Sequence, residues 1–399
     1  MALDLTKVAG QVDGMLTQLK TSREERQQHL ASARYAFSKS SEDFTRLQKK
    51  IDASKTTWLV AGLVERIDQK HSALPLPAEF TVIASDGSHI DVDRHRSAKC
   101  CLINTGGVVL NYGAQPDALL ESQPKLYAGD EDLTITPPDG KGRGQAIEGN
   151  LLGIKRGVEE CQRLAELCSA QPAGSKTVAL VDGTLILWGL EAYPDFVGDV
   201  LLHKGFLPCL DTMRKLNKDK TLAPASYISL PRSADVVNAL KVALCPQELV
   251  DTDRCCPDCK TRECDTLNGL MDRELFTSVL SPGERSAIFL SQSSVVEKHY
   301  GEHAVHFFYL RLDDEIARVE IPQWVAKDEV LLNLTHTLVL DQCKRGHGYP
   351  VALAEAHEQA VVTGIDREDF WQLVDSLLVE EHLPVVTSGK DFSKRMRWV

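Results

Sequence analysis

Two stretches of the chain decide its fold: Phe80-Thr-Val-Ile-Ala-Ser-Asp86-Gly-Ser88 and Thr177-Val-Ala-Leu-Val-Asp182-Gly-Thr-Leu185. Each is a short apolar run that predicts a buried strand breaking at Asp-Gly, with a carboxylate at the strand's C-terminal tip. Two such tips on one sheet would bring two carboxylates together, and these repel each other unless a cation lies between them. The pair therefore predicts a two-metal site of the kind that cleaves phosphodiesters, although a single Asp-Gly is also an ordinary turn.

The composition is that of a globular chain. The 399 residues are 43% hydrophobic and 26% charged, which is enough for one large core or two medium ones. The sequence has no apolar run of the ~18 residues that a membrane span needs, and its N-terminus lacks the blocks of a signal peptide, so we expect a cytoplasmic protein. Because the net charge is -12, a nucleic-acid substrate would have to meet a local basic groove or be delivered by a partner.

Residues 1–55 form a polar N-terminal extension that is predicted to be helical. Apolar residues recur every seven positions and indicate an amphipathic helix over about 22–53. Such a helix could pack across a neighbouring subunit, or it could lie on its own domain. The recurring residues are Leu30, Phe37, Phe44 and Ile51, with Leu47 between the last two.

The core begins near residue 78, and its elements follow the order strand, hairpin, helix, strand, helix, strand, helix. This order predicts an α/β fold with an RNase H-like mixed sheet flanked by helices, in a domain spanning 78–399 with a Cys-rich insert at about 245–264. The expected elements are a strand at 80–85, a hairpin around Thr105-Gly106-Gly107, a surface excursion over 113–143, a helix over 147–167, strands at 177–182 and 226–230, and a helix at 233–244.

The third carboxylate of such a site is expected on the helix that precedes the strand ending at Asp182. The candidates are Glu148, Glu159 and Glu160. Glu159 and Glu160 have basic residues four positions away, as solvated helix pairs do, whereas Glu148 is followed by leucines at i+3 and i+4. The helix runs antiparallel to the strand, so its first turns should lie near Asp182, with Glu160 about 18 Å further along. These arguments favour Glu148, with Glu160 as the alternative.

The segment Gly346-His-Gly-Tyr349-Pro350-Val-Ala-Leu-Ala-Glu-Ala-His357 predicts a helix that starts at Pro350. His357 falls on its second turn. It is either an ordinary helix histidine or the metal-binding or proton-handling residue that a final helix adds to an RNase H-like site. Imidazole combined with carboxylates suits Mn²⁺ as well as Mg²⁺.

Several blocks of the chain together resemble the NurA family of DNA repair nucleases, over about residues 78–375. The last block is the most specific of them. The blocks are Asp86-Gly-Ser88, the Glu148 helix, Asp182-Gly-Thr-Leu185, Tyr227-Ile-Ser-Leu-Pro-Arg232-Ser233, Pro282-Gly-Glu-Arg285-Ser286, Ala317-Arg318-Val-Glu320-Ile-Pro-Gln-Trp324-Val325 and the segment that ends at His357.

The resemblance implies an RNase H-like core, a homodimer and Mn²⁺-dependent degradation of DNA, as a single-strand endonuclease, a 5′–3′ exonuclease or both. It also implies a partner, the HerA-type hexameric DNA-translocating ATPase, in processing DNA ends during double-strand break repair. By the same resemblance, metal would be held by Asp86, Glu148 and Asp182, His357 would complete the site, and Tyr349 would position the substrate or the histidine.

Arg232 stands where members of that family tend to carry a basic residue. It would bind the scissile phosphate through charge-assisted hydrogen bonds, or it is an ordinary surface arginine. The expected reaction is metal-assisted hydrolysis: one ion on Asp86 and Asp182 makes the attacking hydroxide, and a second, shared with Glu148 and His357, stabilises the leaving 3′ oxygen.

Five of the eleven cysteines crowd into the segment 245–264. The Cys256-x-x-Cys259 pair with Cys245 and Cys264 could close a tetrahedral structural Zn²⁺ site. Reduced thiols without a ligand, or thiols with redox chemistry, are the alternatives. The insert is expected to stabilise a loop rather than to take part in cleavage.

Two rival functions remain open from the sequence. The chain could be a non-catalytic adaptor subunit of a DNA-translocating ATPase, which would suit the acidic total and the long N-terminal helix. It could also be an RNase H-like nuclease that acts on RNA. Retention of both aspartates, a candidate glutamate and a histidine argues against the adaptor.

Overall fold

The computed structural model describes residues 4–93, 95, 96 and 98–385, and the chain divides into two compact units. Unit 1 comprises Met1–Ala73, Ile228–Glu297 and Ala304–Val319, and unit 2 comprises Leu74–Tyr227, Lys298–His303 and Glu320–Val399. Over the described ranges, each helix is too short or too polar to cross a membrane.

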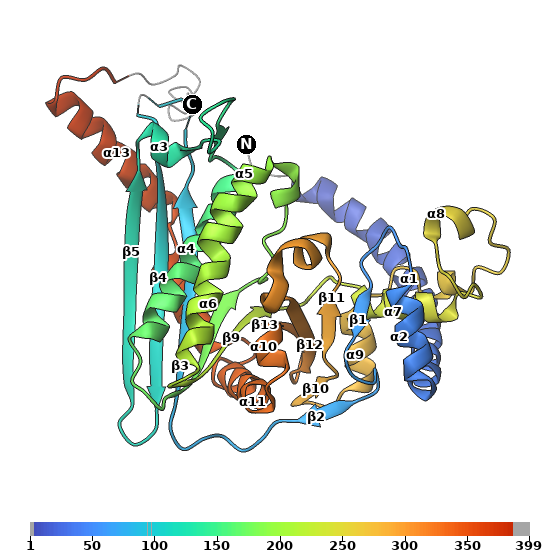
Figure 1. Ribbon diagram of the computed structural model, residues 1–399. Helices are drawn as coiled ribbons and strands as arrows, with labels where there is room; N and C mark the ends of the chain where they lie inside the picture. Colours follow the sequence, from blue (N-terminus) through green and yellow to red (C-terminus); the bar gives the residue numbers. More distant parts are fainter. Residues whose placement is uncertain (1–3, 94, 97, 386–399) are drawn as a thin grey trace. The chain divides into compact units, whose positions relative to one another are not determined.

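Unit 2 contains a mixed sheet in the order β5-β4-β3-β8-β9 (Figure 1). The first three strands along the chain are antiparallel neighbours, and β8 and β9 then add in parallel to β3. The strands are β3 (Phe80–Ile90), β4 (Cys101–Tyr112), β5 (Asp117–Tyr127), β8 (Lys176–Asp182) and β9 (Thr221–Ile228), and a separate short pair consists of β6 (Thr134–Ile135) and β7 (Gln145–Ala146).

Helices cover this sheet, and two of them carry side chains of interest. Both α4 (Asn150–Ser169) and α12 (Val351–Ala360) pack on β3 and β4. The predictions of a helix over 147–167 and of a helix starting at Pro350 are confirmed. The other helical segments of unit 2 are α3 (Asp130–Leu133), η1 (Leu190–Ala192), α5 (Asp195–Gly198), η2 (Asp199–Phe206), α6 (Leu207–Leu216), η5 (Gly301–His303), α10 (Gln323–Ala326), α11 (Glu329–Arg345) and α13 (Gly364–Glu380).

Asp86 lies within β3 and not at its end, so the prediction that this strand breaks at Asp-Gly is wrong. The parallel pairing with β8 stops at Ser85 and Val181, but the antiparallel pairing with β4 continues to Ile90 and Leu102. The strand extends because β4 keeps supplying hydrogen-bond partners after β8 has ended. Asp86 therefore lies at the level of β3 where β8 stops pairing with it.

The predicted hairpin around Gly106 and Gly107 is also wrong, because β4 runs through both residues as one strand. The actual hairpin joins β4 to β5 beyond Gly113, whose φ is 140°, so part of the predicted surface excursion is strand. The two glycines leave room for helices instead. A Cβ on Gly106 would meet α12 and a Cβ on Gly107 would meet Leu167 of α4, which places the two helices on opposite faces of the sheet.

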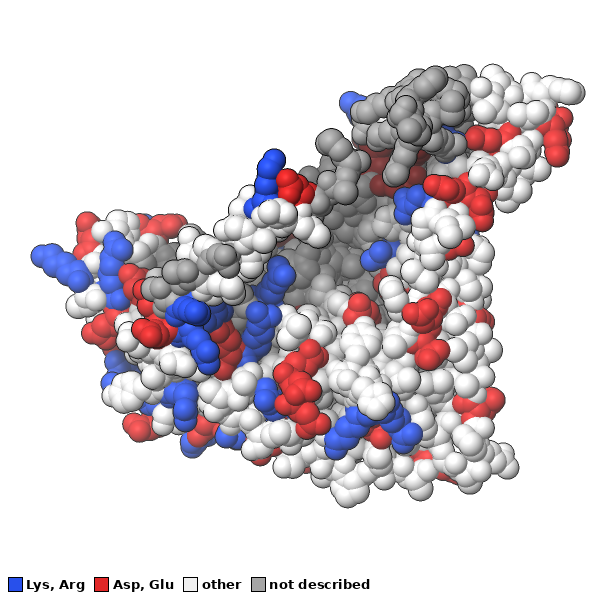
Figure 2. Space-filling view, turned by 180° about the vertical axis from the view of Figure 1, so that it is seen from behind, with Lys and Arg blue, Asp and Glu red and all other residues white. Residues whose placement is uncertain are grey.

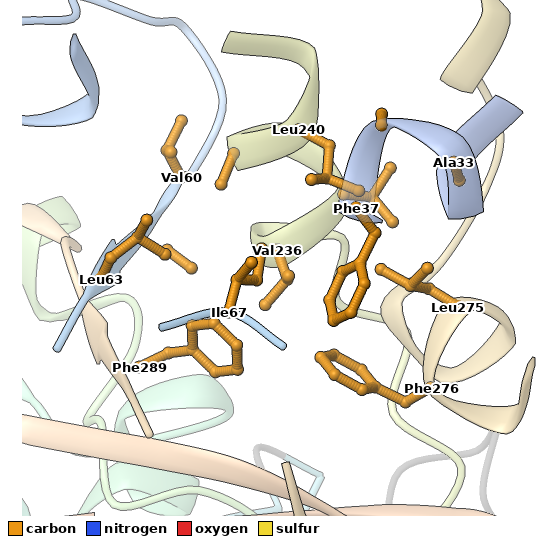
Figure 3. Close-up of a cluster of buried hydrophobic side chains, with 14 of the residues drawn as sticks. Ala33, Phe37, Val60, Leu63, Ile67, Val236, Leu240, Leu275, Phe276 and Phe289 are labelled. Atoms are coloured by element: carbon orange, nitrogen blue, oxygen red, sulfur yellow. The ribbon is translucent and has the colours of Figure 1, made fainter. Parts of the chain in front are cut away.

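The strands of unit 1 follow the order β1-β11-β12-β13, and β10 pairs with both β12 and β2. Its buried cluster joins α7, α9 and the N-terminal helices (Figure 3), with Phe37 edge-on to Phe276 and Phe276 stacked on Tyr309 at 4.5 Å. The elements are α1 (Leu5–Glu42), α2 (Phe44–Asp52), β1 (Ala61–Leu63), β2 (Lys70–Ser72), α7 (Asp235–Leu244), α8 (Thr252–Cys255), η3 (Glu263–Leu267), α9 (Asp272–Val279), β10 (Glu284–Ser286), β11 (Phe289–Ser291) and β12 (Val305–Arg311), while η4 (Val296–Tyr300) and β13 (Ile316–Pro322) cross the division.

The predicted helix over 22–53 is two helices, because Asp43 ends α1 and caps α2 by accepting a hydrogen bond from the Arg46 amide. Its seven-residue stripe is used inside unit 1. Phe37, Leu47 and Ile51 are buried, and the other members of the stripe pack against the same cluster. Of the two alternatives for this stripe, packing on its own domain is the one that the structure shows.

Candidate functional site

Asp86 and Asp182 each lie one residue beyond the last pair between β3 and β8, Ser85 with Val181. The prediction that two carboxylates meet on neighbouring parallel strands is therefore confirmed. Asp182 does end its strand, since Gly183 turns the chain with φ 86°. The next pair of strands adds a support, because Tyr227 of β9 pairs with Asp182 and its carbonyl accepts from the Gly183 amide at 3.0 Å.

The helix that begins after Pro350 brings two side chains to these aspartates. The Tyr349 hydroxyl donates to Asp182 Oδ1 at 2.8 Å, and His357 Nδ1 lies 2.7 Å from Asp86 Oδ2. An ionised carboxylate only accepts hydrogen bonds, so Nδ1 carries the proton and the Nε2 lone pair of a neutral His357 remains available. Metal-binding histidines are commonly oriented in this way.

The residues that fix α12 on the sheet were not predicted from the sequence. Asn104 Nδ2 donates to the carbonyls of Gln359 and Ala360, at 3.2 and 2.9 Å, and Ser88 Oγ donates to Ala360 at 2.7 Å. Gly106 lets the backbones meet, since a Cβ there would lie 2.2 Å from the Ala356 carbonyl. The paired glycines in an apolar stretch were the available signal, because glycine inside a strand often marks close approach of another backbone.

Glu160 projects from the middle of α4 against β3. The Ser85 hydroxyl donates to the Glu160 carbonyl at 2.8 Å, which fixes the level of the helix beside the strand. Gly87, on the same face of β3, leaves space for the carboxylate, since a Cβ there would lie 2.6 Å from Oε1. Arg156 Nε is 2.9 Å from Oε1, but the contact lacks hydrogen-bond geometry, so this buried oxygen has no hydrogen-bond partner in the described residues.

The three carboxylates influence one another. Burial raises the pKa of Glu160 to about 8; Arg156 opposes this rise, and the charges of Asp86 and Asp182 add to it. Burial also raises the pKa of Asp182, where the hydrogen bond from Tyr349 opposes the rise and the charge of Asp86 adds to it. Asp86 therefore lies within electrostatic range of both Glu160 and Asp182, and Asp182 lies within electrostatic range of Glu160.

Glu148 is next to Gly149, whose amide donates to Asp91 Oδ2 at 3.0 Å, so its place at the site stays a prediction and the structure favours the alternative, Glu160. It lies exposed, before the first residue of α4, and Asn150 is ten residues from Glu160, or about 15 Å along the helix axis. The prediction assumed that Asp86 ends its strand. Because β3 continues to Ile90, the first turns of α4 lie beside that extension, and the middle of the helix reaches Asp86.

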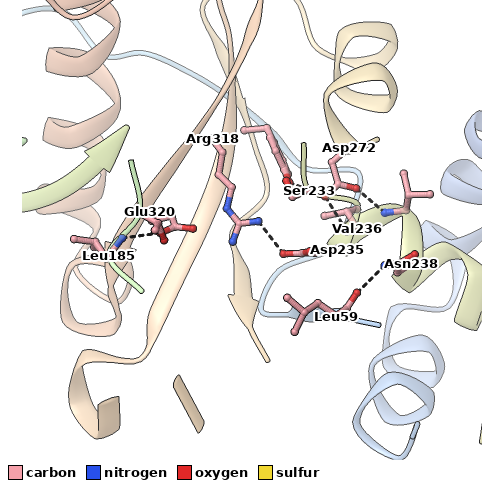
Figure 4. Close-up of polar contacts among 12 residues, drawn as sticks. Leu59, Leu185, Ser233, Asp235, Val236, Asn238, Asp272, Arg318 and Glu320 are labelled. Carbon is pink, nitrogen blue, oxygen red and sulfur yellow. Dashed lines mark hydrogen bonds and ion pairs between the residues drawn. The ribbon is translucent and has the colours of Figure 1, made fainter. Parts of the chain in front are cut away.

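The loop that follows Asp182 is held by buried side chains of unit 2. Glu320 Oε2 accepts from Thr184 Oγ1 at 2.7 Å and from the Leu185 amide at 2.9 Å (Figure 4). The Tyr300 hydroxyl accepts from the Leu187 amide and donates to the Leu185 carbonyl, both at 2.9 Å. These bonds leave the carboxylate of Asp182 on a fixed backbone.

Arg232 belongs to unit 1 and its side chain is exposed, so its role toward a phosphate stays a prediction. Over the described part of the chain, no group of three His, Cys, Asp or Glu side chains already has the arrangement of a metal site. At the candidate site the reason is visible: Asp86 faces His357, Asp182 faces Tyr349, and Glu160 faces Arg156.

Fold and site define a mixed α/β protein with a carboxylate cluster beside its central parallel strands. The profile of the NurA domain matches residues 80–362, so the chain belongs to the NurA family, whose members are nucleases that act on DNA in its repair. Among curated proteins, none matches the chain. A solved structure of an Argonaute from Aquifex aeolicus matches with a TM-score of 0.26 and 11% identity, over 70% of this chain and 28% of that protein.

Proposed function

We propose that this chain is a metal-dependent nuclease that cuts DNA, as a single-strand endonuclease, a 5′–3′ exonuclease or both, during the processing of double-strand breaks. The observation that carries the proposal is that Asp86 and Asp182 lie side by side where the pairing of β3 with β8 ends, with His357 bonded to Asp86 and Glu160 within electrostatic range of both aspartates. The strand order of unit 2, three antiparallel strands followed by two parallel ones, supports an RNase H-like classification.

The donor set fits Mn²⁺ or Mg²⁺. Three carboxylates supply the oxygen ligands that these ions prefer, His357 adds an imidazole that suits Mn²⁺, and Oε1 of Glu160 is a buried oxygen in need of a partner. Bound there, such an ion supplies an activated water and neutralises charge on the leaving oxygen. Glu160 takes the place of Glu148 in the proposed ligand set, together with Asp86 and Asp182.

The surrounding residues hold this set in place. Tyr349 orients Asp182 through its hydroxyl, and Asp86 orients the ring of His357. The His357 side chain is 61% exposed, so Nε2 can bind a ligand or pass a proton to and from solvent. Arg156 serves as the counter-ion of Glu160 until a cation replaces it.

The substrate cannot be attracted by overall charge. On the face shown in Figure 2, basic and acidic side chains are interspersed, in line with the net charge of -12. We infer that DNA is delivered by a HerA-type hexameric ATPase to a homodimer of this chain. The N-terminal half of α1 is a candidate docking element, because Leu5, Val12, Leu16 and Leu19 are exposed on it.

Cleavage assays test the proposal. The full chain would be incubated with end-labelled single-stranded DNA or RNA, with Mn²⁺, Mg²⁺ or EDTA. We expect DNA cleavage that EDTA abolishes and that D86N and D182N lack while circular dichroism shows them folded. The matched pair E160Q and E148Q separates the two third-carboxylate assignments: E160Q should be inactive and E148Q should cut as wild type does. Folded D86N and D182N that still cut would refute the site, and cleavage of RNA alone would reassign the substrate.

Docking is tested separately by truncation. Deleting residues 1–24 removes the exposed part of α1 and keeps Arg26, which pairs with Glu274, and the buried Ala33 and Phe37. We expect the truncated chain to remain folded and to elute apart from a HerA-type hexamer in gel filtration, whereas the full chain co-elutes with it. Unchanged co-elution would place the docking surface elsewhere.

A further inference from the structure

The cysteines of the insert are the inward-facing side chains of a segment without a core. Six of the eleven cysteines are buried in unit 2, and the five between 245 and 264, in unit 1, are half-exposed and without disulfides. Over residues 253–266, all other side chains are exposed, and Cys255, Cys256, Cys259 and Cys264 alone are partly covered. Because only the cysteines of this segment are partly covered, the segment buries little apolar area that could stabilise its fold. Small segments of this kind commonly depend on a metal ion or on disulfides for their stability.

The backbone around two of these cysteines forms a tight turn. In Cys256-Pro257-Asp258-Cys259, the Cys259 amide donates to the Cys256 carbonyl at 3.3 Å. A CxxC turn closed in this way sends both thiols to the same side, as a tetrahedral thiolate site requires. The following residues add positive charge, since Arg262 lies within electrostatic range of Cys256 and Cys259.

Two further thiols lie where the insert leaves and rejoins unit 1. Cys245 caps the C-terminus of α7, where its amide donates to Lys241 and Val242, and Cys264 lies in the first turn of η3. Both Cys245 and Cys256 lie within electrostatic range of Cys264, and Cys245 also lies within range of Cys256. The turn and the two ends of the insert therefore face one another.

We propose that Cys245, Cys256, Cys259 and Cys264 bind one structural Zn²⁺ ion, which closes the insert. Thiolates are soft ligands that select zinc over the Mn²⁺ or Mg²⁺ of a carboxylate site. Cys255 is outside the set because it is not part of the CxxC turn. Its sulfur lies 3.9 Å from the Leu249 carbonyl, and that of Cys259 lies 3.7 Å from the Thr261 hydroxyl, a weak contact that the ion would replace. Within the described residues no three His, Cys, Asp or Glu side chains already have the arrangement of a metal site. Binding of zinc would therefore require the four thiols to lose their protons and to rotate toward the ion, while the CxxC backbone keeps its turn.

Zinc content and cysteine substitutions test the site without reference to nuclease activity. The full chain, purified under reducing conditions without a histidine tag, should contain one zinc ion per chain by elemental analysis. The double variant C256S/C259S should lose at least ~90% of it, and the neighbouring control C255S should keep it. Cobalt in place of zinc should give the intense charge-transfer absorption of a tetrahedral thiolate site in wild type and C255S only.

Proteolysis gives a second, independent readout. Arg254, Lys260 and Arg262 are exposed trypsin sites inside the insert. A thiol-competent chelator should speed cleavage at these sites about tenfold or more in wild type, and added zinc should restore protection there but not in C256S/C259S. Less than about 0.1 zinc per chain after reconstitution, or zinc that C256S/C259S retains, would overturn the proposal. Quantitative disulfide formation by freshly purified protein would also overturn it, in favour of redox chemistry.

Discussion

The contact between Gly106 and α12 gives the sharpest test of how the site is assembled. In Gly106→Ala the new Cβ would lie 2.2 Å from the Ala356 carbonyl and 2.7 Å from the Ala360 amide. Both atoms are backbone, so no rotamer change relieves the clash, and α12 must move away from β4 by somewhat more than ~1 Å to reach ordinary contact distance. His357 follows Ala356 directly, so the histidine moves with the helix.

The magnitude follows from the structure in two parts. Overpacking of this kind costs about 1–3 kcal/mol, and the displaced helix end also weakens the bonds from Asn104 and Ser88, each contributing about 1 kcal/mol. We expect a total loss of about 3 kcal/mol in the free energy of unfolding. A displacement of 1 Å at a catalytic group lowers the rate about 100-fold, so cleavage of single-stranded DNA in Mn²⁺ should fall by that factor.

The assay combines urea denaturation with cleavage of labelled single-stranded DNA. Gly153→Ala is the matched control, because it lies inside α4 and a Cβ there meets no atom within 4 Å. It should stabilise the protein by about 0.5–1 kcal/mol and leave the rate unchanged, since alanine favours a helix over glycine. A Gly106→Ala protein with wild-type rate and stability would show that α12 does not rest on this glycine.

Four other substitutions test individual interactions. Glu160→Gln should stabilise the protein in EDTA at pH 8 and above, by up to ~4 kcal/mol. The reason is that a carboxyl whose pKa is raised from 4.5 to about 8 contributes stability below pH 4.5 that is lost as the pH rises toward 8. The free energy of unfolding, measured by denaturation between pH 5 and 9, should therefore decline with pH in wild type and change less in the variant. Arg156→Gln should raise the affinity for Mn²⁺ in calorimetry about tenfold, since a guanidinium 2.9 Å from Glu160 competes with a cation, and unchanged affinity would exclude that competition. Tyr349→Phe should slow cleavage about tenfold at unchanged melting temperature, the effect of one hydrogen bond to Asp182, and a wild-type rate would count against its positioning role. Asp272→Ala in unit 1 should cost roughly 3–5 kcal/mol in unfolding, because three buried donors lose their acceptor, and a loss below about 1 kcal/mol would contradict the hydrogen bonding in Figure 4.

The sequence predicted those parts of the site that depend on local patterns. Asp182-Gly ends an apolar run and does end a strand, and Pro350 does start a helix with His357 on its second turn. Both signals lie within a few residues of the feature that they predict. Asp86-Gly looked the same in sequence and did not end its strand, because the continued pairing with β4 is a tertiary fact that no local pattern contains.

That single difference explains why the sequence favoured Glu148 over Glu160. The level of α4 along β3 depends on where the strand ends, so the error over Asp86 moved the expected third carboxylate by twelve residues, from Glu160 to Glu148. The ion pairs of Glu159 and Glu160 with basic residues four positions away looked like ordinary surface pairs. Both side chains are largely buried, and what distinguishes them is their neighbours: Glu160 lies against Gly87 of β3, whereas Glu159 accepts from the Tyr127 hydroxyl and pairs with Lys155.

The site also shows why a carboxylate cluster is evidence for a cation rather than for stability. In the absence of a cation, ionised Glu160 is desolvated and is repelled by Asp86 and Asp182. Arg156 offsets only part of the free-energy cost of this ionisation. A protein that needed only a stable core at this position would be better served by apolar residues of the same volume. The surrounding bonds from Tyr349, Ser88 and Asn104 instead hold the charged groups in place, which agrees with the proposal that these groups bind a metal ion.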